Sequence, residues 1–62
     1  MSKIIHAGMY DEQDHNVESD ACKILYNFMV EQNSRVLETE FFIDGKKITM
    51  ELKITSINGR ML

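Results

Sequence analysis

Two runs of alternating apolar and polar residues, separated by Asp44-Gly45, constrain the fold of this chain most strongly. Leu37, Thr39, Phe41 and Ile43 share one face of residues 35–43, and Ile48, Met50, Leu52 and Ile54 share one face of residues 47–57, which is the two-residue period of a β-strand with one buried face. Asp-Gly between two such runs is typical of a two-residue type I′ turn, because both central residues of that turn need a positive φ. The sequence therefore predicts a β-hairpin over residues 35–57.

The turn length also fixes the register of this hairpin. A two-residue turn places the apolar residues of both strands on one face, whereas a longer turn with a bulge would set Glu40 opposite Ile48 and mix the two faces. We therefore expect the shorter turn, although it sets Glu38 opposite Glu51, and like charges across a ladder are unfavourable. The pairs expected on the apolar face are Leu37 with Leu52, Thr39 with Met50, and Phe41 with Ile48.

An amphipathic helix is predicted before the hairpin, over residues 17–33. Its apolar residues recur at spacings of three and four, which is the helical period. Asp14, Asn16 or Ser19 can each cap its N-terminus, and the polar pair Asn33-Ser34 follows its end in place of the usual glycine. The apolar residues of this face are Val17, Ala21, Ile24, Leu25, Phe28 and Met29.

A second apolar stripe lies beside the first on the same helix. Cys22, Tyr26 and Val30 recur at intervals of four residues, and they widen the apolar sector to roughly 240°, well beyond what a surface helix needs. One hairpin covers only one side of such a helix. We therefore expect this stripe to be buried against a partner, with a two-fold dimer favoured. Val36 and Phe42, on the polar face of the hairpin, are further candidates for the interface.

The predicted fold is a single small α+β domain over residues 1–62, with the helix packed across the inner face of the antiparallel hairpin. A two-stranded hairpin is marginal alone, so a third strand is expected from the N-terminal segment or from a second subunit. The core should join residues of the hairpin, Leu37, Phe41, Ile48, Met50, Leu52 and Ile54, to residues of the helix, Val17, Ile24, Leu25 and Phe28.

The two ends of the chain give weaker signals. Within residues 1–16, a short strand is predicted at Ile4-Ile5, followed by a polar, acidic loop over residues 9–16. Asn58-Gly59 is a second turn signal, and the tail over residues 58–62 either begins another strand or frays.

The length of 62 residues leaves a thin margin of stability, because a chain this short buries only about 60% of its unfolded surface. Cys22 is the single cysteine, so no internal disulfide is possible. A homo-oligomer, or docking on another protein, is the remaining support for so small a scaffold. The free thiol and the lack of a long apolar run predict a cytoplasmic protein. Frequent isoleucine and lysine suit a bacterial, phage or mobile-element origin.

No group of residues matches a known catalytic, cofactor or metal motif. His6, His15 and Cys22 are the soft metal ligands, and their spacing lacks the close pairs of structural zinc sites. Cys22 as a nucleophile would need a base oriented by a third group, and nothing in the sequence places one beside it. We therefore expect no enzyme activity, no cofactor and no metal.

Two charged groups remain as candidate contact sites. An acidic patch, Asp11, Glu12, Asp14 and Glu18, is either a helix-capping loop or a surface that meets a basic partner. The cations of the second half, Lys46, Lys47, Lys53 and Arg60, are few and mixed with acids, unlike the basic stripe of a nucleic-acid-binding protein. The expected function is a small non-enzymatic protein-binding or regulatory module. A nucleic-acid-binding dimer is the first alternative, and a Cys22-dependent enzyme or metal protein is the second.

Overall fold

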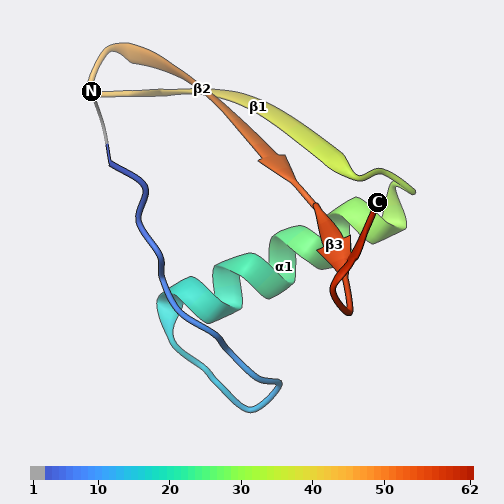
Figure 1. The fold of residues 1–62 in the computed structure, drawn as a ribbon. Coiled ribbons are helices and arrows are strands. Elements are labelled where there is room, and N and C mark those ends of the chain that lie inside the picture. Colours follow the sequence, from blue (N-terminus) through green and yellow to red (C-terminus); the bar gives the residue numbers. More distant parts are fainter. Residues whose placement is uncertain (1–2) are drawn as a thin grey trace.

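The computed structural model describes residues 3–62, and it shows one helix followed by two β-hairpins of unequal length (Figure 1). The predicted α+β class and the order of helix and hairpin are confirmed. The elements are α1 (Val17–Glu31), β1 (Val36–Ile43), β2 (Lys46–Lys53), β3 (Ser56–Ile57) and β4 (Arg60–Met61).

Polar side chains and one left-handed residue define the ends of α1. Of the three candidate caps, Asn16 is the N-cap, and its side-chain oxygen accepts a hydrogen bond of 2.8 Å from the backbone N–H of Ser19. At the other end, Asn33 has a φ of 55°. Its N–H donates to the carbonyl of Val30, and the N–H of Ser34 donates to the carbonyl of Met29. This is the Schellman arrangement, with asparagine in the usual position of glycine.

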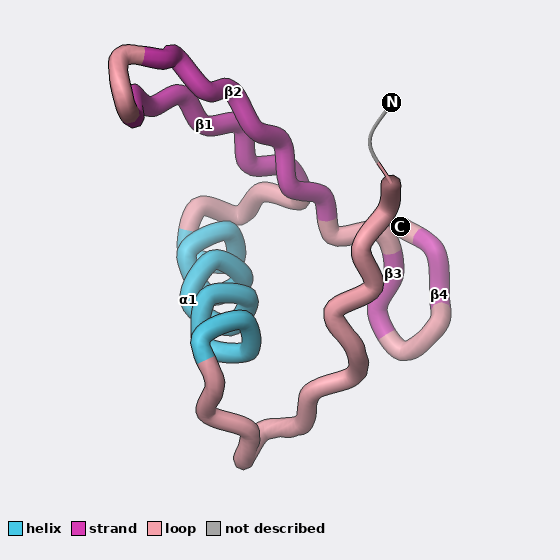
Figure 2. The backbone as a smooth tube through the Cα atoms, turned by 90° about the vertical axis from the view of Figure 1, so that its left-hand side faces the viewer, coloured by secondary structure: helices cyan, strands magenta, loops and turns pink. Residues whose placement is uncertain are grey.

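The long hairpin has the predicted turn and register. Asp44 and Gly45 have φ values of 51° and 73°, as a type I′ turn requires. Phe41 pairs with Ile48, and the other predicted pairs hold as well. The regular ladder is shorter than predicted, because β2 ends at Lys53, and the chain then turns away into β3 (Figure 2).

The expected third strand is absent from the part of the chain that the structure describes. Residues 3–16 form no strand, so the prediction at Ile4-Ile5 is wrong. The C-terminal residues do form a strand, but β4 pairs with β3 around the turn at Asn58-Gly59 in a separate two-stranded sheet. The sheet of β1 and β2 therefore keeps two strands and two edges.

The core differs from the predicted one. Among residues 3–62, only Met29, which is 1% exposed, and Ser19 are buried. The hairpin meets α1 only at its base, around Leu52 and Ile54, and in both views its outer half leans away from the helix (Figures 1 and 2). Several predicted core residues of both elements are consequently exposed: Val17, Ile24, Leu25, Phe28, Phe41, Met50 and Leu52.

The surface area of the chain measures how open this fold is. The accessible surface is 6130 Å², whereas a compact protein of 7.2 kDa would expose about 4,100 Å². The radius of gyration is 13.5 Å, compared with about 11 Å for a compact domain of this length. The chain by itself therefore leaves roughly 2,000 Å² more surface in water than its mass requires.

Candidate association surface

Exposed apolar side chains follow one side of α1. Val17, Ile24 and Phe28 recur at helical spacing, and we call them the open helix stripe. Val17 is 81% exposed and Ile24 is 66% exposed. The sequence identified these residues as apolar and periodic, but it assigned them to the core. The structure instead directs Met29, about a third of a turn away around the helix, toward the hairpin base.

Apolar side chains of the hairpin add to this exposed surface. On its inner face, Phe41, Ile43 and Met50 are all exposed, because the outer half of the hairpin has no helix beneath it. On its outer face, Val36 is exposed and Phe42 is 75% exposed. The two outer-face residues lie in the positions that the sequence proposed for a partner interface, and their contact with a partner stays a prediction.

The predicted interface stripe of Cys22, Tyr26 and Val30 lies between two segments of its own chain. Tyr26 and Cys22 line an open cleft of about 600 Å³ with Tyr10 of the N-terminal loop. Tyr26 and Val30 line a second cleft, of about 330 Å³, with Leu62 at the C-terminus. Tyr26 is 45% exposed and Val30 is 54% exposed. The stripe is thus half covered by the chain itself.

Tyr10 is a contact residue that sequence reasoning missed, because residues 9–16 show no apolar period. Its hydroxyl donates a hydrogen bond of 3.1 Å to the carbonyl of Ala7. Partial burial of the phenol, and then the nearby charges of Glu18, Cys22 and Asp14, raise the pKa of Tyr10 above its ordinary value of 10.0. The neutral phenol is therefore the form that suits this position between the loop and α1.

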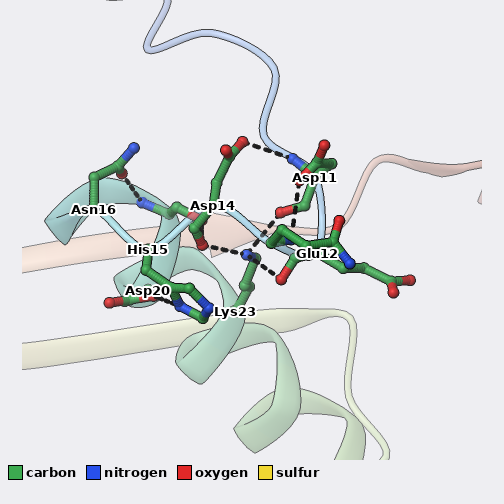
Figure 3. Close-up of polar contacts among 9 residues, drawn as sticks. Asp11, Glu12, Asp14, His15, Asn16, Asp20 and Lys23 are labelled. Carbon is green, nitrogen blue, oxygen red and sulfur yellow. Dashed lines mark hydrogen bonds and ion pairs between the residues drawn. The ribbon is translucent and has the colours of Figure 1, made fainter.

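The acidic segment is an ordered loop that surrounds a cation from its own helix (Figure 3). The ammonium of Lys23 donates to the carbonyls of Asp11 and Asp14 at 2.8 Å each, and to that of Glu12 at 3.4 Å. One carboxylate oxygen of Asp11 accepts from the N–H of Gln13, and one of Asp14 accepts from the N–H of Asp11. These two carboxylates of the predicted acidic patch therefore hydrogen-bond to the backbone of their own loop.

The cations of the second half form no continuous basic face. Lys47 is 3.3 Å from a carboxylate oxygen of Glu40, and Lys53 is 3.3 Å from one of Glu51. Arg60 lies on β4, in the other sheet. On the outer face of the hairpin, Glu38, Glu40 and Glu51 lie between Lys47 and Lys53, so this face lacks the continuous basic surface typical of nucleic-acid-binding proteins.

Among the described residues, no three metal-ligating side chains lie close enough together to hold an ion. Cys22 is exposed, and His15 is 3.5 Å from a carboxylate oxygen of Asp20 on the first turn of α1. No helix within residues 3–62 has the length and apolar character needed to cross a membrane. The geometry thus offers association surfaces and clefts as its candidate sites.

Comparisons with models of known protein families, with curated proteins and with solved structures found no match to this chain.

Proposed function

We propose that this chain is a small non-enzymatic protein-binding module, and that protein contacts cover the apolar surface that its own fold leaves open. The observation that carries the proposal is the excess surface, roughly 2,000 Å² above that of a compact chain of the same mass. Stable protein interfaces bury about 800 Å² of each partner. The excess is therefore large enough to supply a complete interface.

The composition of this surface supports the same proposal. Monomeric proteins rarely leave large contiguous apolar patches in water, and such patches commonly mark interaction sites. The open helix stripe has aliphatic and aromatic side chains that are exposed to solvent. Aromatic residues such as Phe28 and Phe42 are enriched at the centres of protein interfaces.

A matched pair of helix variants tests the proposal. Ile24→Lys places a charge in the open helix stripe, and Asn27→Lys places the same charge on the exposed polar side of α1. We expect Ile24→Lys to weaken the retention of binding proteins about tenfold or more, because a buried unpaired charge is costly. Asn27→Lys should behave like the parent chain. If the two variants associate equally well, the open helix stripe has no part in binding.

A further inference from the structure

The β2 strand has an open edge with an ordered set of unpaired backbone groups. In an antiparallel hairpin with a two-residue turn, the residues that flank the turn are hydrogen-bonded to each other, and this pattern alternates along the ladder. The hydrogen bond from the N–H of Ile54 to the carbonyl of Arg35 fits this alternation. Lys47, Thr49 and Glu51 therefore direct their N–H and C=O groups away from β1, and no backbone group of residues 3–62 pairs with them.

We propose that the β2 edge binds the β2 edge of a second copy of this chain, antiparallel, with Thr49 opposite Thr49. This proposal rests on the proposed function and names its first partner. In this register, Lys47 of each copy faces Glu51 of the other on the outer face. On the inner face, Ile48 faces Met50. Opposite charges, paired threonines and paired apolar residues are all favourable across a ladder.

Other two-fold registers of β2 are less favourable. Moving the axis to Met50 sets Lys47 opposite Lys53, so two like-charged pairs replace two attractive ones. Moving it to Ile48 sets Lys47 opposite Thr49 and leaves Glu51 opposite Gly45 in the turn. Of these three registers, only the one centred on Thr49 sets Lys47 of each copy opposite Glu51 of the other. A two-fold axis perpendicular to the sheet always pairs odd-numbered residues of one β2 strand with odd-numbered residues of the other, and even with even. The outer and inner faces of the two strands therefore never mix.

The edge of β1 lacks this self-complementarity. Glu38 and Glu40 are the outer-face residues at its middle, and the two-fold registers centred on residues 38–40 set a glutamate opposite a glutamate. Such charges are a common device against pairing at an edge. The two edges of one hairpin therefore differ in a way that directs a second copy to β2.

The outer face of β2 also has a like-charge contact that a second copy would relieve. Glu38 lies directly opposite Glu51 in the ladder. The side chain of Glu51 is 52% exposed, with Lys53 as its cationic neighbour. Lys47 of the second copy would add a cation beside Glu51, which would reduce the repulsion between Glu51 and Glu38.

The resulting dimer would have a more stable architecture than the single chain. It would contain a four-stranded antiparallel sheet in the order β1-β2-β2-β1, and rotation about an axis perpendicular to this sheet would keep both helices on the same face. Three or more strands with an apolar face are what an independently stable sheet requires. The inner-face residues Ile48 and Met50 would then lie in the middle of the sheet instead of at its edge.

Charge exchange between two variants tests this register directly. Lys47→Glu alone and Glu51→Lys alone each create two like-charged pairs, so we expect each variant to raise the dimer dissociation constant about tenfold. A mixture of the two variants restores both attractive pairs, and it should form a heterodimer about as tightly as the parent dimer. Lys46→Glu is the control, because it makes the same charge change on the same strand, outside these pairs and without breaking either ion pair of the hairpin.

The backbone supplies a second, independent test. N-methylation of Thr49 in a synthetic chain removes a donor from the β2 edge, and N-methylation of Glu40, opposite Thr49, removes one from the β1 edge. Only the first should abolish the dimer, and the amide of Thr49 should exchange slowly in the parent chain. A dimer that tolerates methyl-Thr49, and in which Lys46→Glu acts as strongly as Lys47→Glu, would overturn this interface while leaving the proposed function intact. A folded monomer at all concentrations would overturn the interface as well, and partner retention by the Ile24 and Asn27 variants would then decide the proposed function.

Discussion

At the scale of single residues, Met29 is the main anchor between the helix and the rest of the chain. Its side chain is the one fully buried apolar group among residues 3–62, and it lines one small cleft with Leu52 and Ile54 at the base of the hairpin. Ser19, the other buried residue, donates its hydroxyl to the carbonyl of Asp14 and so fixes the loop before α1. A core this small makes the stability of the chain depend on very few contacts.

Truncation of Met29 should therefore be costly. We expect Met29→Ala to lower the free energy of unfolding by about 2–4 kcal/mol, because it removes a buried side chain and leaves a cavity. Urea denaturation followed by circular dichroism measures this change. Met9→Ala is the control, since Met9 is 95% exposed and its truncation should cost almost nothing. Equal stability of the two variants would contradict the assignment of Met29 as the anchor.

The raised pKa of Tyr10 predicts that the stability of the folded chain falls at alkaline pH. Because its pKa is raised in the folded chain above 10.0, the folded state holds this proton more tightly than the unfolded state. The contribution of Tyr10 is therefore complete below pH 10.0, and it is lost as the pH rises from there through the higher pKa of the folded chain. Tyr10→Phe should remove the fall in stability that ionisation of Tyr10 causes, as measured by urea midpoints at neutral and alkaline pH. An identical alkaline loss in parent and variant would show that Tyr10 has no part in it.

At the scale of elements, local patterns predicted the hairpin far better than they predicted the packing of the helix. The register between β1 and β2 followed from the Asp44-Gly45 turn and the two-residue period, which are local properties. The apolar sector of α1, by contrast, spans roughly 240°, and periodicity alone cannot say which part of it faces the hairpin. The sequence therefore assigned Val17 and Ile24 to the core. The cleft beside Tyr10 was missed because it depends on a loop with no pattern.

The C-terminal end of α1 allows a sharp test at this scale. Asn33 has a φ of 55°, a conformation that costs an ordinary L-residue roughly 1–2 kcal/mol. We expect Asn33→Ala to lower the free energy of unfolding by about 1 kcal/mol, and Asn33→Gly to leave it unchanged or raise it slightly. Thermal unfolding of the three chains gives the comparison. If alanine and glycine were equivalent here, the left-handed cap would not contribute to stability.

At the scale of the whole molecule, the chain folds into elements that cover one another incompletely. It buries about 40% of its unfolded surface instead of the roughly 60% usual for its length. Three features show where this burial is missing: the clefts on either side of Tyr26, the open helix stripe and the β2 edge. Because small domains have only a few kcal/mol of stability, contacts from a second chain would contribute a large share of it.

The mass of the chain in solution tests this account most directly. Light scattering over a concentration series should give twice the 7.2 kDa of one chain, and the urea midpoint should rise with concentration, because association stabilises the folded state by mass action. A cooperatively folded monomer of 7.2 kDa at every concentration, with a urea midpoint that does not change, would contradict the proposed dimer.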